Sequence, residues 1–312
     1  MHTMNLNQQI PEITLKPFRA TAVIDWLDVE IHTSRRTQHQ HVRKALAEIT
    51  GIAHWWAGTI DVQSGNTANT FRIRLHDDLA NNYQQLCATL DNLAERYPFA
   101  SEPTITGIEI SCDFLHKQQS EEATRALIYR LQTSLFVPGS NHRQYNSDLR
   151  KNQFLDKPGN RINPVHNLRI GNKNDAISWQ CYYKITDKNK LPLPANQCCA
   201  RVEVTLKGYA LQQHGFDLLS GLPSFKFETL ASLFTLRRPI PAVTLAKGDL
   251  FKLTSINWNR EYRDATAERG LHSFSTIGQR DKKGRLRAES SHLKADAELS
   301  NRVREALRNL RP

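Results

Sequence analysis

Apolar and polar residues follow regular spacings along the first 114 residues, and the pattern predicts six elements of secondary structure. Four stretches rich in β-forming residues are predicted to be strands: 23–31, 54–62, 69–76 and 105–114. Apolar residues recur at helical spacing in two further stretches, 37–50 and 80–97. The resulting order, β-α-β-β-α-β, is that of the ferredoxin-like split βαβ unit, whose antiparallel sheet keeps one face uncovered.

The remaining chain predicts more antiparallel strands and a helical end. A helix is expected at 120–135 and a polar loop at 138–164. The later predicted elements are strands at 166–171, 177–186 and 199–207, helical segments within 209–236, and an amphipathic helix at 294–311. We therefore predict an α+β fold with a basic helical C-terminal region. The expected divisions are a flexible N-terminus (1–20), the ferredoxin-like unit (21–114), a catalytic half (115–236) and the C-terminal region (237–312).

Composition narrows the class of protein. The 312 residues are 39% hydrophobic and 23% charged, which allows a real core and argues against wholesale disorder. No apolar run approaches the ~20 residues that span a bilayer, and the first residues lack the pattern of a secretory signal. Five cysteines without a C-x-x-C pair disfavour both a disulfide framework and a zinc ribbon. We expect a cytoplasmic protein that does not bind membranes.

Positive charge is concentrated in the second half of the chain. The formal net charge is +11, but residues 1–142 carry −3 and residues 143–312 carry +14. A one-sided basic field is typical of proteins that bind a polyanion, most often nucleic acid. The alternative is a solvated cationic face that keeps the protein soluble.

The polar loop at 138–164 combines basic and aromatic residues. Tyr145 and Phe154 are interleaved with five cations: Arg143, Arg150, Lys151, Lys157 and Arg161. Such a mix suits phosphate contacts and base stacking on a single strand, although a mobile surface loop has the same composition. Arg143, Arg150, Lys151 and Arg161 are our nucleic-acid-binding candidates here, and Lys173 and Lys207 are further candidates in the catalytic half.

Three predicted strands place polar residues on one face, because successive side chains of a strand point to opposite sides. The polar sets are Glu109, Ser111 and Asp113 in 105–114; Ser178, Gln180, Tyr182, Lys184 and Thr186 in 177–186; and Arg201, Glu203, Thr205 and Lys207 in 199–207. If the apolar faces share one core, these polar sets share the opposite face.

Carboxylates on that shared face suggest a metal site. Glu109 and Asp113 lie ~13 Å apart along one strand, but either can pair with Glu203 across neighbouring strands. Two or three carboxylates form a hard-oxygen site suited to Mg²⁺ or Mn²⁺. A tyrosine such as Tyr182 needs a metal, a lysine or a base to act as a nucleophile near neutral pH. The alternative to a metal site is that these polar residues form the ordinary solvent-exposed face of an antiparallel sheet.

Two further acidic residues lie earlier in the chain, on the first predicted strand. Asp25 and Asp28 are separated by an odd spacing on the opening strand, so strict alternation sends them to opposite faces and disfavours a joint metal role.

The blocks VIDWLDVEI (23–31), GIEISCDF (107–114), LRIGNKND with WQCYYKITDK (168–188) and ARVEVTLKG (200–208) occur in one order. This ordered set resembles the replication initiation factors of filamentous phages and the related trans-acting replication proteins of small plasmids. The resemblance covers most of residues 20–235 with loose spacing.

The resemblance implies a DNA-nicking enzyme that starts rolling-circle replication. Tyr182 matches the tyrosine that attacks the scissile phosphodiester. Lys184 matches a lysine expected either to stabilise charge on the pentacovalent phosphorus or to lower the pKa of the tyrosine. Arg201 matches an arginine expected to clamp phosphate. Glu109, Asp113 and Glu203 match the acidic positions that would hold Mg²⁺ or Mn²⁺. The implied partners are single- and double-stranded origin DNA and a host helicase, in the bacterial cytoplasm, with a dimer among the possible oligomeric states.

Some features depart from the pattern or leave alternatives open. The histidine pair that many rolling-circle nickases use for metal is absent, since His39 and His41 flank a polar residue at a predicted helix start. Tyr183 is next to Tyr182, so a one-residue change of register would exchange the nucleophile. Two other functions remain: a noncatalytic nucleic-acid-binding protein that uses the free sheet face, and a conjugative relaxase with the same chemistry.

Overall fold

A computed structural model describes residues 13–52, 56–62, 66–135, 137, 140–146, 149–155, 162–187, 190–239 and 293–312. The predictions for residues 1–12 of the N-terminus and for 240–292 of the C-terminal region lie outside these ranges. The same is true of Lys157 and Arg161.

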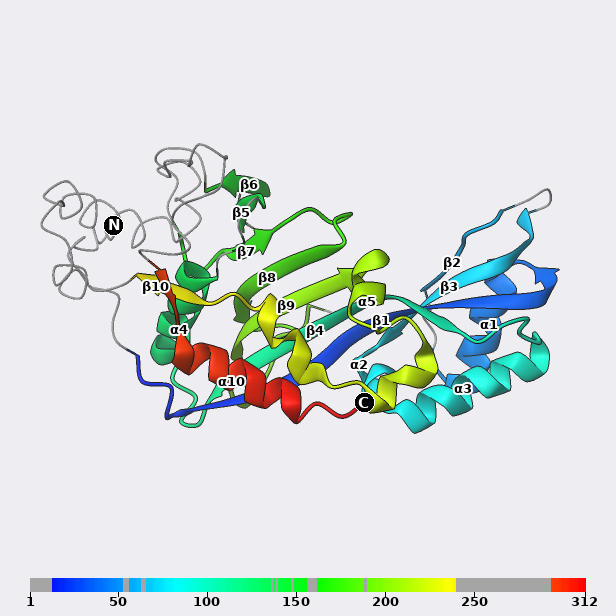
Figure 1. The fold of residues 1–312 in the computed structure, drawn as a ribbon, viewed down its shortest axis with the longest axis horizontal. Coiled ribbons are helices and arrows are strands. Elements are labelled where there is room, and N and C mark those ends of the chain that lie inside the picture. The colour runs from blue at the N-terminus through cyan, green and yellow to red at the C-terminus, as the bar shows by residue number, and fades with distance from the viewer. Residues whose placement is uncertain are drawn as a thin grey trace, which may run out of the picture.

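Nine of the described strands form one large antiparallel sheet in the order β2-β3-β1-β4-β9-β8-β7-β5-β6 (Figure 1). The strands are β1 (Phe18–Thr37), β2 (Trp56–Thr59), β3 (Ala68–His76), β4 (Thr104–His116), β5 (His142–Asn146), β6 (Lys151–Phe154), β7 (Asn167–Ile170), β8 (Ile177–Lys184) and β9 (Cys199–Lys207). The predicted α+β class with antiparallel strands is therefore confirmed.

The first four strands and two helices form the expected ferredoxin-like unit. The helices α1 (His39–Thr50) and α3 (Tyr83–Arg96) alternate with the strands, and a short helix α2 (Asp77–Ala80) precedes α3. The order β2-β3-β1-β4 has antiparallel neighbours throughout, as the split βαβ arrangement requires. Because β4 also pairs with β9, the sheet continues from this unit into the second half of the chain.

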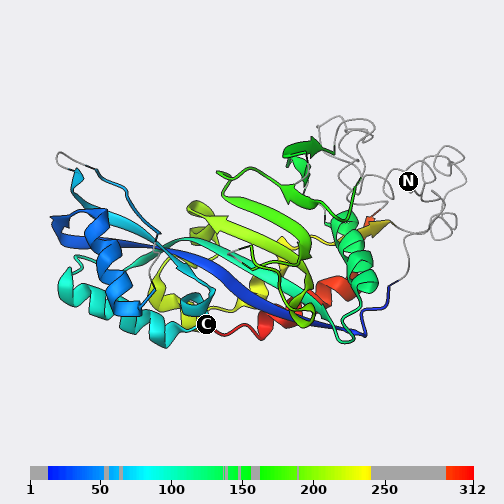
Figure 2. The same ribbon diagram turned by 180° about the vertical axis from the view of Figure 1, so that it is seen from behind.

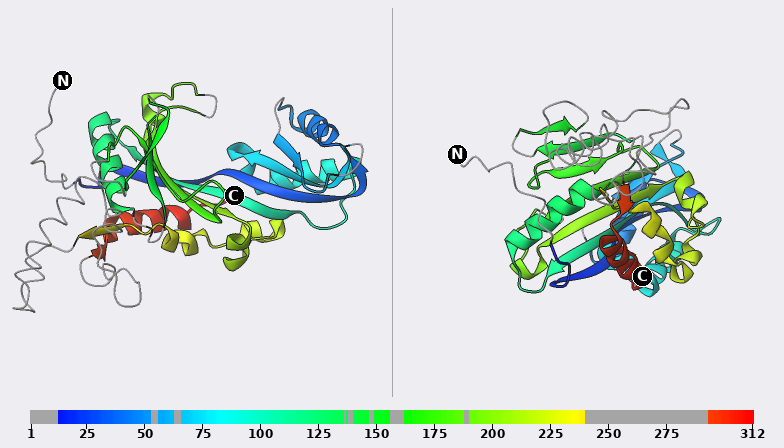
Figure 3. Two further views of the ribbon diagram at one scale, coloured as in Figure 1. Left: turned by 90° about the horizontal axis from the view of Figure 1, so that it is seen from above. Right: turned by 60° about the vertical axis from the view of Figure 1, so that its left-hand side comes forward.

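β1 is the longest described strand and runs through the length of the molecule. It connects the end that carries α1 and α3 with the end that carries α4 (Glu121–Ser134) and α10 (Ala297–Arg308) (Figures 2 and 3). The prediction for this strand, 23–31, captured only its middle, because its outer parts carry polar and basic residues.

Strict alternation defines the apolar face of the central strands. Ile108, Ile110, Cys112 and Phe114 of β4 are fully buried, and so are Val202, Val204 and Leu206 of β9. Helix α4 packs against β8 and β9, and α10 packs against β1 and the 3₁₀ helix η4 (Phe227–Leu233). The polar residues of the same strands are thereby directed to the opposite face.

The predicted loop at 138–164 contains two strands, β5 and β6, at the edge of the sheet, and this prediction was wrong. The residues that β5 buries are polar: His142, Gln144 and Asn146. Gln144 is satisfied by Gln132 and by the backbone of Asn163. A hydropathy pattern cannot detect a strand whose inward side chains are polar.

The last segments are short helices and one amphipathic helix. The region 209–236 contains η4, α5 (Tyr209–Gln213) and η3 (Leu219–Ser224), after the small η2 (Ala195–Gln197). Asp296 caps α10 and forms a buried ion pair with Arg130 of α4 at 2.9 Å. A two-stranded ladder joins β10 (Arg237–Pro239) to β11 (Leu293–Ala295). No helix in the described ranges is long and apolar enough to cross a bilayer.

Candidate functional site

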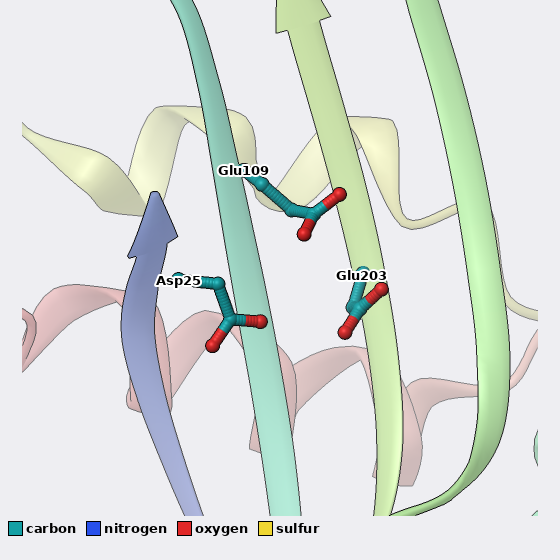
Figure 4. Close-up of side chains that lie close together, drawn as sticks. All are labelled: Asp25, Glu109 and Glu203. Atoms are coloured by element: carbon teal, nitrogen blue, oxygen red, sulfur yellow. The ribbon is translucent and has the colours of Figure 1, made fainter. Parts of the chain in front are cut away.

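Three carboxylates from three adjacent strands meet on the polar face of the sheet. Asp25 of β1, Glu109 of β4 and Glu203 of β9 each place one oxygen within 4.8 Å of the other two (Figure 4). The register explains the meeting: Trp26 lies opposite Glu109, and Ser111, two residues after Glu109, lies opposite Glu203. We call Asp25, Glu109 and Glu203 the carboxylate centre.

Asp25 reaches this centre because β1 contains a bulge. The pairing of β1 with β4 shifts between Ile24 and Trp26, so the residue between them interrupts the alternation. Asp25 accepts hydrogen bonds from Ser111 and Arg201, and Asp28 lies opposite Gly107 on the same face. The prediction that Asp25 and Asp28 face opposite sides was therefore wrong. The block DWLD was visible in the sequence, but a bulge depends on the partner strand.

Arg201 is the cation beside the carboxylate centre, and it is buried. Its Nε and Nη2 donate to the two carboxylate oxygens of Asp113 at 2.5 and 2.6 Å. Its Nη1 donates to Asp25 at 2.6 Å and lies 3.5 Å from Glu203. Burial alone would lower the pKa of Arg201, but the hydrogen bonds and charge of Asp113 raise it, so the guanidinium stays charged. Arg201, which was predicted to bind phosphate, therefore binds carboxylates in the structure.

The predicted ligand set and the observed centre differ by one residue. Glu109 and Glu203 are brought together, whereas Asp113 is bound by both arms of Arg201 and is not part of the group. Asp25 takes the third place. A bidentate guanidinium engages one lone pair on each carboxylate oxygen and compensates the charge of the group, so such a carboxylate is a poorer ligand for a cation.

Burial gives the carboxylate centre unusual acid–base properties. Only 3% of Glu203 is exposed, and burial raises its pKa well above the ordinary value, with the charges of Glu109 and Asp25 adding to the rise. Burial also raises the pKa of Glu109, against an opposing hydrogen bond from Thr205. Both oxygens of Glu109 accept hydrogen bonds: Oε1 from Trp26 Nε1 at 2.8 Å and Oε2 from Thr205 Oγ1 at 2.8 Å.

Tyr182 of β8 lies next to the centre. Its hydroxyl donates to Glu203 Oε1 at 2.6 Å, and its backbone lies opposite Arg201. Burial raises the pKa of the phenol, and the charge of Glu203 raises it further. Tyr183 points to the other face, where the Arg125 guanidinium of α4 lies 5.3 Å from its ring centroid. Of the two adjacent tyrosines, Tyr182 is thus the one that contacts the carboxylates.

An open cleft of about 530 Å³ lies beside these residues. Lys184 and Arg201 line it together with Asp25 and Asp113. Its other walls come from β1, from α2 and from residues 309–311, which follow α10. Lys184 thus lies in the cleft on the same face as Tyr182, two residues further along β8.

The predicted nucleic-acid-binding residues that the structure describes lie in β5, at the start of β6, between β7 and β8, and at the end of β9. Arg150 and Lys151 are exposed where β6 begins. Arg143 of β5 donates to the Gly171 carbonyl at 2.5 Å, and burial lowers its pKa with help from the charge of Arg169. Lys207 donates to the backbone carbonyl of Lys173 at 2.9 Å.

The sequence matches no protein-family model and no curated protein. Among solved structures it is similar to a rolling circle replication initiator protein from Geobacillus stearothermophilus, with 14% identity and a TM-score of 0.36. That similarity covers 81% of this chain and 100% of the other. An aspartate kinase from Clostridium acetobutylicum is similar over 65% of this chain and 34% of its own, with 9% identity and a TM-score of 0.20. Both TM-scores are below 0.5.

Proposed function

We propose that this protein is a metal-dependent DNA nicking and resealing enzyme that uses Tyr182 as its nucleophile and initiates rolling-circle replication of a phage or plasmid. One observation carries the proposal: the Tyr182 hydroxyl donates at 2.6 Å to Glu203, the buried member of the carboxylate centre. A phenol, a base and candidate ligands for a divalent cation are thus in contact.

The charge of the site supports a divalent cation. Four carboxylates, Asp25, Glu109, Asp113 and Glu203, surround the single guanidinium of Arg201, so the group is strongly anionic when ionised. The donors are all carboxylate oxygens, which suit Mg²⁺ or Mn²⁺ better than softer metals. Asp25, Glu109 and Glu203 would hold the ion. Once bound, the ion would polarise the scissile phosphate and offset its negative charge.

The residues of the chain can perform the transfer of the phosphoryl group. Tyr182 passes its proton to Glu203, the carboxylate that already accepts its hydrogen bond at 2.6 Å. The phenolate oxygen attacks the phosphorus and forms a new P–O bond while the bond to the 3′ oxygen breaks. That oxygen takes the proton from Glu203 and leaves as a free 3′-OH, and the 5′ phosphate stays on Tyr182. Attack by a 3′-OH reverses these steps and reseals the strand.

Lys184 and Arg201 have different roles in this proposal. Lys184 lines the cleft and would donate to the phosphate oxygens as charge develops on them. Arg201 acts through its partners, since it bridges Asp113 to Asp25 and thereby fixes where Asp25 lies. It is a positioning residue.

The charge distribution supports DNA as the substrate. Residues 143–312 carry a net charge of +14, and a basic field attracts the phosphate backbone. The proposed partners are origin DNA, in single- and double-stranded form, and a host helicase in the bacterial cytoplasm.

The test is a nicking assay on a supercoiled plasmid that carries the DNA region encoding this chain. With Mn²⁺ or Mg²⁺, the wild-type protein should nick the plasmid and remain attached to the DNA through denaturing electrophoresis. Tyr182→Phe should abolish the adduct, while Tyr183→Phe, the matched control on the other face, should keep it. An adduct that persists in Tyr182→Phe would exclude this nucleophile, and nicking that is unaffected by EDTA would exclude the metal.

A noncatalytic nucleic-acid-binding protein is the second candidate. It is favoured by one observation: Trp56, an aromatic residue on the same face of the sheet as the carboxylate centre, is 50% exposed. That function predicts tight binding of DNA without nicking under any metal condition.

A further inference from the structure

Two tryptophans on the polar face lie against glycines, and one of them, Trp26, contacts the carboxylate centre. A Cβ atom added to Gly107 would come 3.1 Å from Cζ3 of Trp26, and one added to Gly58 would come 3.3 Å from two ring atoms of Trp56. Any side chain at these glycines would therefore crowd the indole ring. The absence of side chains lets both rings lie close to the sheet.

Arg74 of β3 lies between the two rings. Its guanidinium carbon is 4.0 Å from the centroid of Trp26 and 5.7 Å from that of Trp56, both within the range of cation–π contact. Asp28 holds the guanidinium with two hydrogen bonds of 2.7 Å each. The planar group is thus fixed in orientation by its own carboxylate.

We call Trp26, Arg74 and Trp56 the aromatic platform. It is open to solvent at its outer end, because Trp56 is 50% exposed on β2, one of the two edge strands of the large sheet. It is joined to the carboxylate centre at its inner end, because Trp26 Nε1 donates to Glu109 at 2.8 Å. Lys207 lies over the Trp26 ring at 5.9 Å and supplies a cation alongside.

We propose that the aromatic platform binds single-stranded DNA next to the carboxylate centre, with a base stacked on Trp56 and the backbone passing Lys207. This inference rests on the proposed function for its choice of DNA. Every base has a π-face, so stacking on an indole is tolerant of sequence, and a neighbouring cation offsets the phosphate charge. Because the platform adjoins Glu109, a strand bound there would lead directly to Tyr182 and Glu203.

The test measures binding without catalysis. A fluorescein-labelled 20-nucleotide single strand of mixed sequence is titrated with the full-length protein in EDTA, and its anisotropy is followed. Trp56→Leu keeps an apolar side chain but removes the ring, and should weaken binding about tenfold. Trp56→Phe keeps a π-face and should retain most of the affinity. Ile60→Ala, a matched control in the same segment and 46% exposed, should bind as the wild type does.

The outcomes separate this inference from the proposed function. If Trp56→Leu binds the strand as tightly as the wild type, the platform is not a DNA site, whether or not the wild type nicks plasmid DNA. If Trp56→Leu instead alters the sedimentation coefficient of the free protein, the platform is a contact between copies of the chain and the inference is overturned. If binding weakens as expected but no adduct forms in the nicking assay, the platform stands and the proposed nicking function fails.

Discussion

Carboxylates on the polar face fall into two groups that differ in how they are neutralised. Asp28 and Asp113 are each held by two hydrogen bonds from one arginine, Arg74 and Arg201 respectively. The carboxylate centre has no arginine of its own and shares only the Nη1 group of Arg201, which lies 2.6 Å from Asp25 and 3.5 Å from Glu203. Within the described ranges no other cation forms an ion pair with the centre.

The comparison shows that the position of an acid on the sheet does not decide its chemistry. Residues of the same type, on the same face and within a few residues of each other, are fixed structural partners in one place and candidate ligands in another. The difference is the number of cations within reach. Asp28 and Asp113 each have one guanidinium, so their charge is balanced. The three carboxylates of the centre share part of a single guanidinium, and burial raises the pKa of Glu109 and Glu203.

The largest expected effect is on stability and comes from removing the guanidinium of Arg201. Arg201→Met should lower the free energy of unfolding by about 3–5 kcal/mol, because it leaves the largely buried carboxylates of Asp113 and Asp25 without their guanidinium. Arg74→Met should cost less, since the Arg74 side chain is 34% exposed. Urea unfolding monitored by circular dichroism measures both. Arg308→Met, at an exposed pair with Glu228, should leave stability unchanged, and equal losses for Arg201→Met and Arg308→Met would contradict the comparison.

A smaller effect, stabilisation by a divalent cation, separates the carboxylate centre from Asp28 and Asp113, the two carboxylates that each pair with one arginine. Mn²⁺ should raise the melting temperature of the wild type, with a stabilisation of about 2.7 kcal/mol when its concentration is 100 times the Kd. Glu203→Gln should lose this shift, because it removes a ligand from the centre. Asp28→Asn, a change at a clamped acid, should keep it. A full shift in Glu203→Gln would show that Mn²⁺ binds elsewhere.

The smallest effect is the dependence of stability on pH without metal. Because the folded-state pKa of Glu203 is raised above its unfolded value, its contribution is present at acidic pH and is lost as the pH rises through the folded-state pKa. In EDTA, Glu203→Gln should therefore become more stable relative to the wild type as the pH rises above the ordinary range of glutamate. Urea unfolding of both proteins from pH 4 to pH 8 gives this difference. A constant difference across that range would mean that folding does not raise the pKa of Glu203.

Much of the fold followed from local patterns. The alternation in 105–114 and 199–207 predicted which residues of β4 and β9 form the core, and the order of strands and helices predicted the ferredoxin-like unit. β5 was missed because its inward residues are polar, and β6 was missed because none of its residues is buried. Gln144 of β5 is satisfied by Gln132 and by the backbone of Asn163, which lie outside the strand. Burial of a satisfied polar group leaves no trace in hydropathy.

The sequence by itself determined the face on which Glu109, Tyr182 and Glu203 lie, because the direction of a side chain along a strand is a local property with a period of two residues. Only the tertiary structure decided that Asp25 joins them and that Arg201 takes Asp113 away. Both outcomes depend on how β1, β4 and β9 pair, and on one bulge in that pairing. Register between strands is set by contacts between distant segments, so no stretch of sequence read alone contains it.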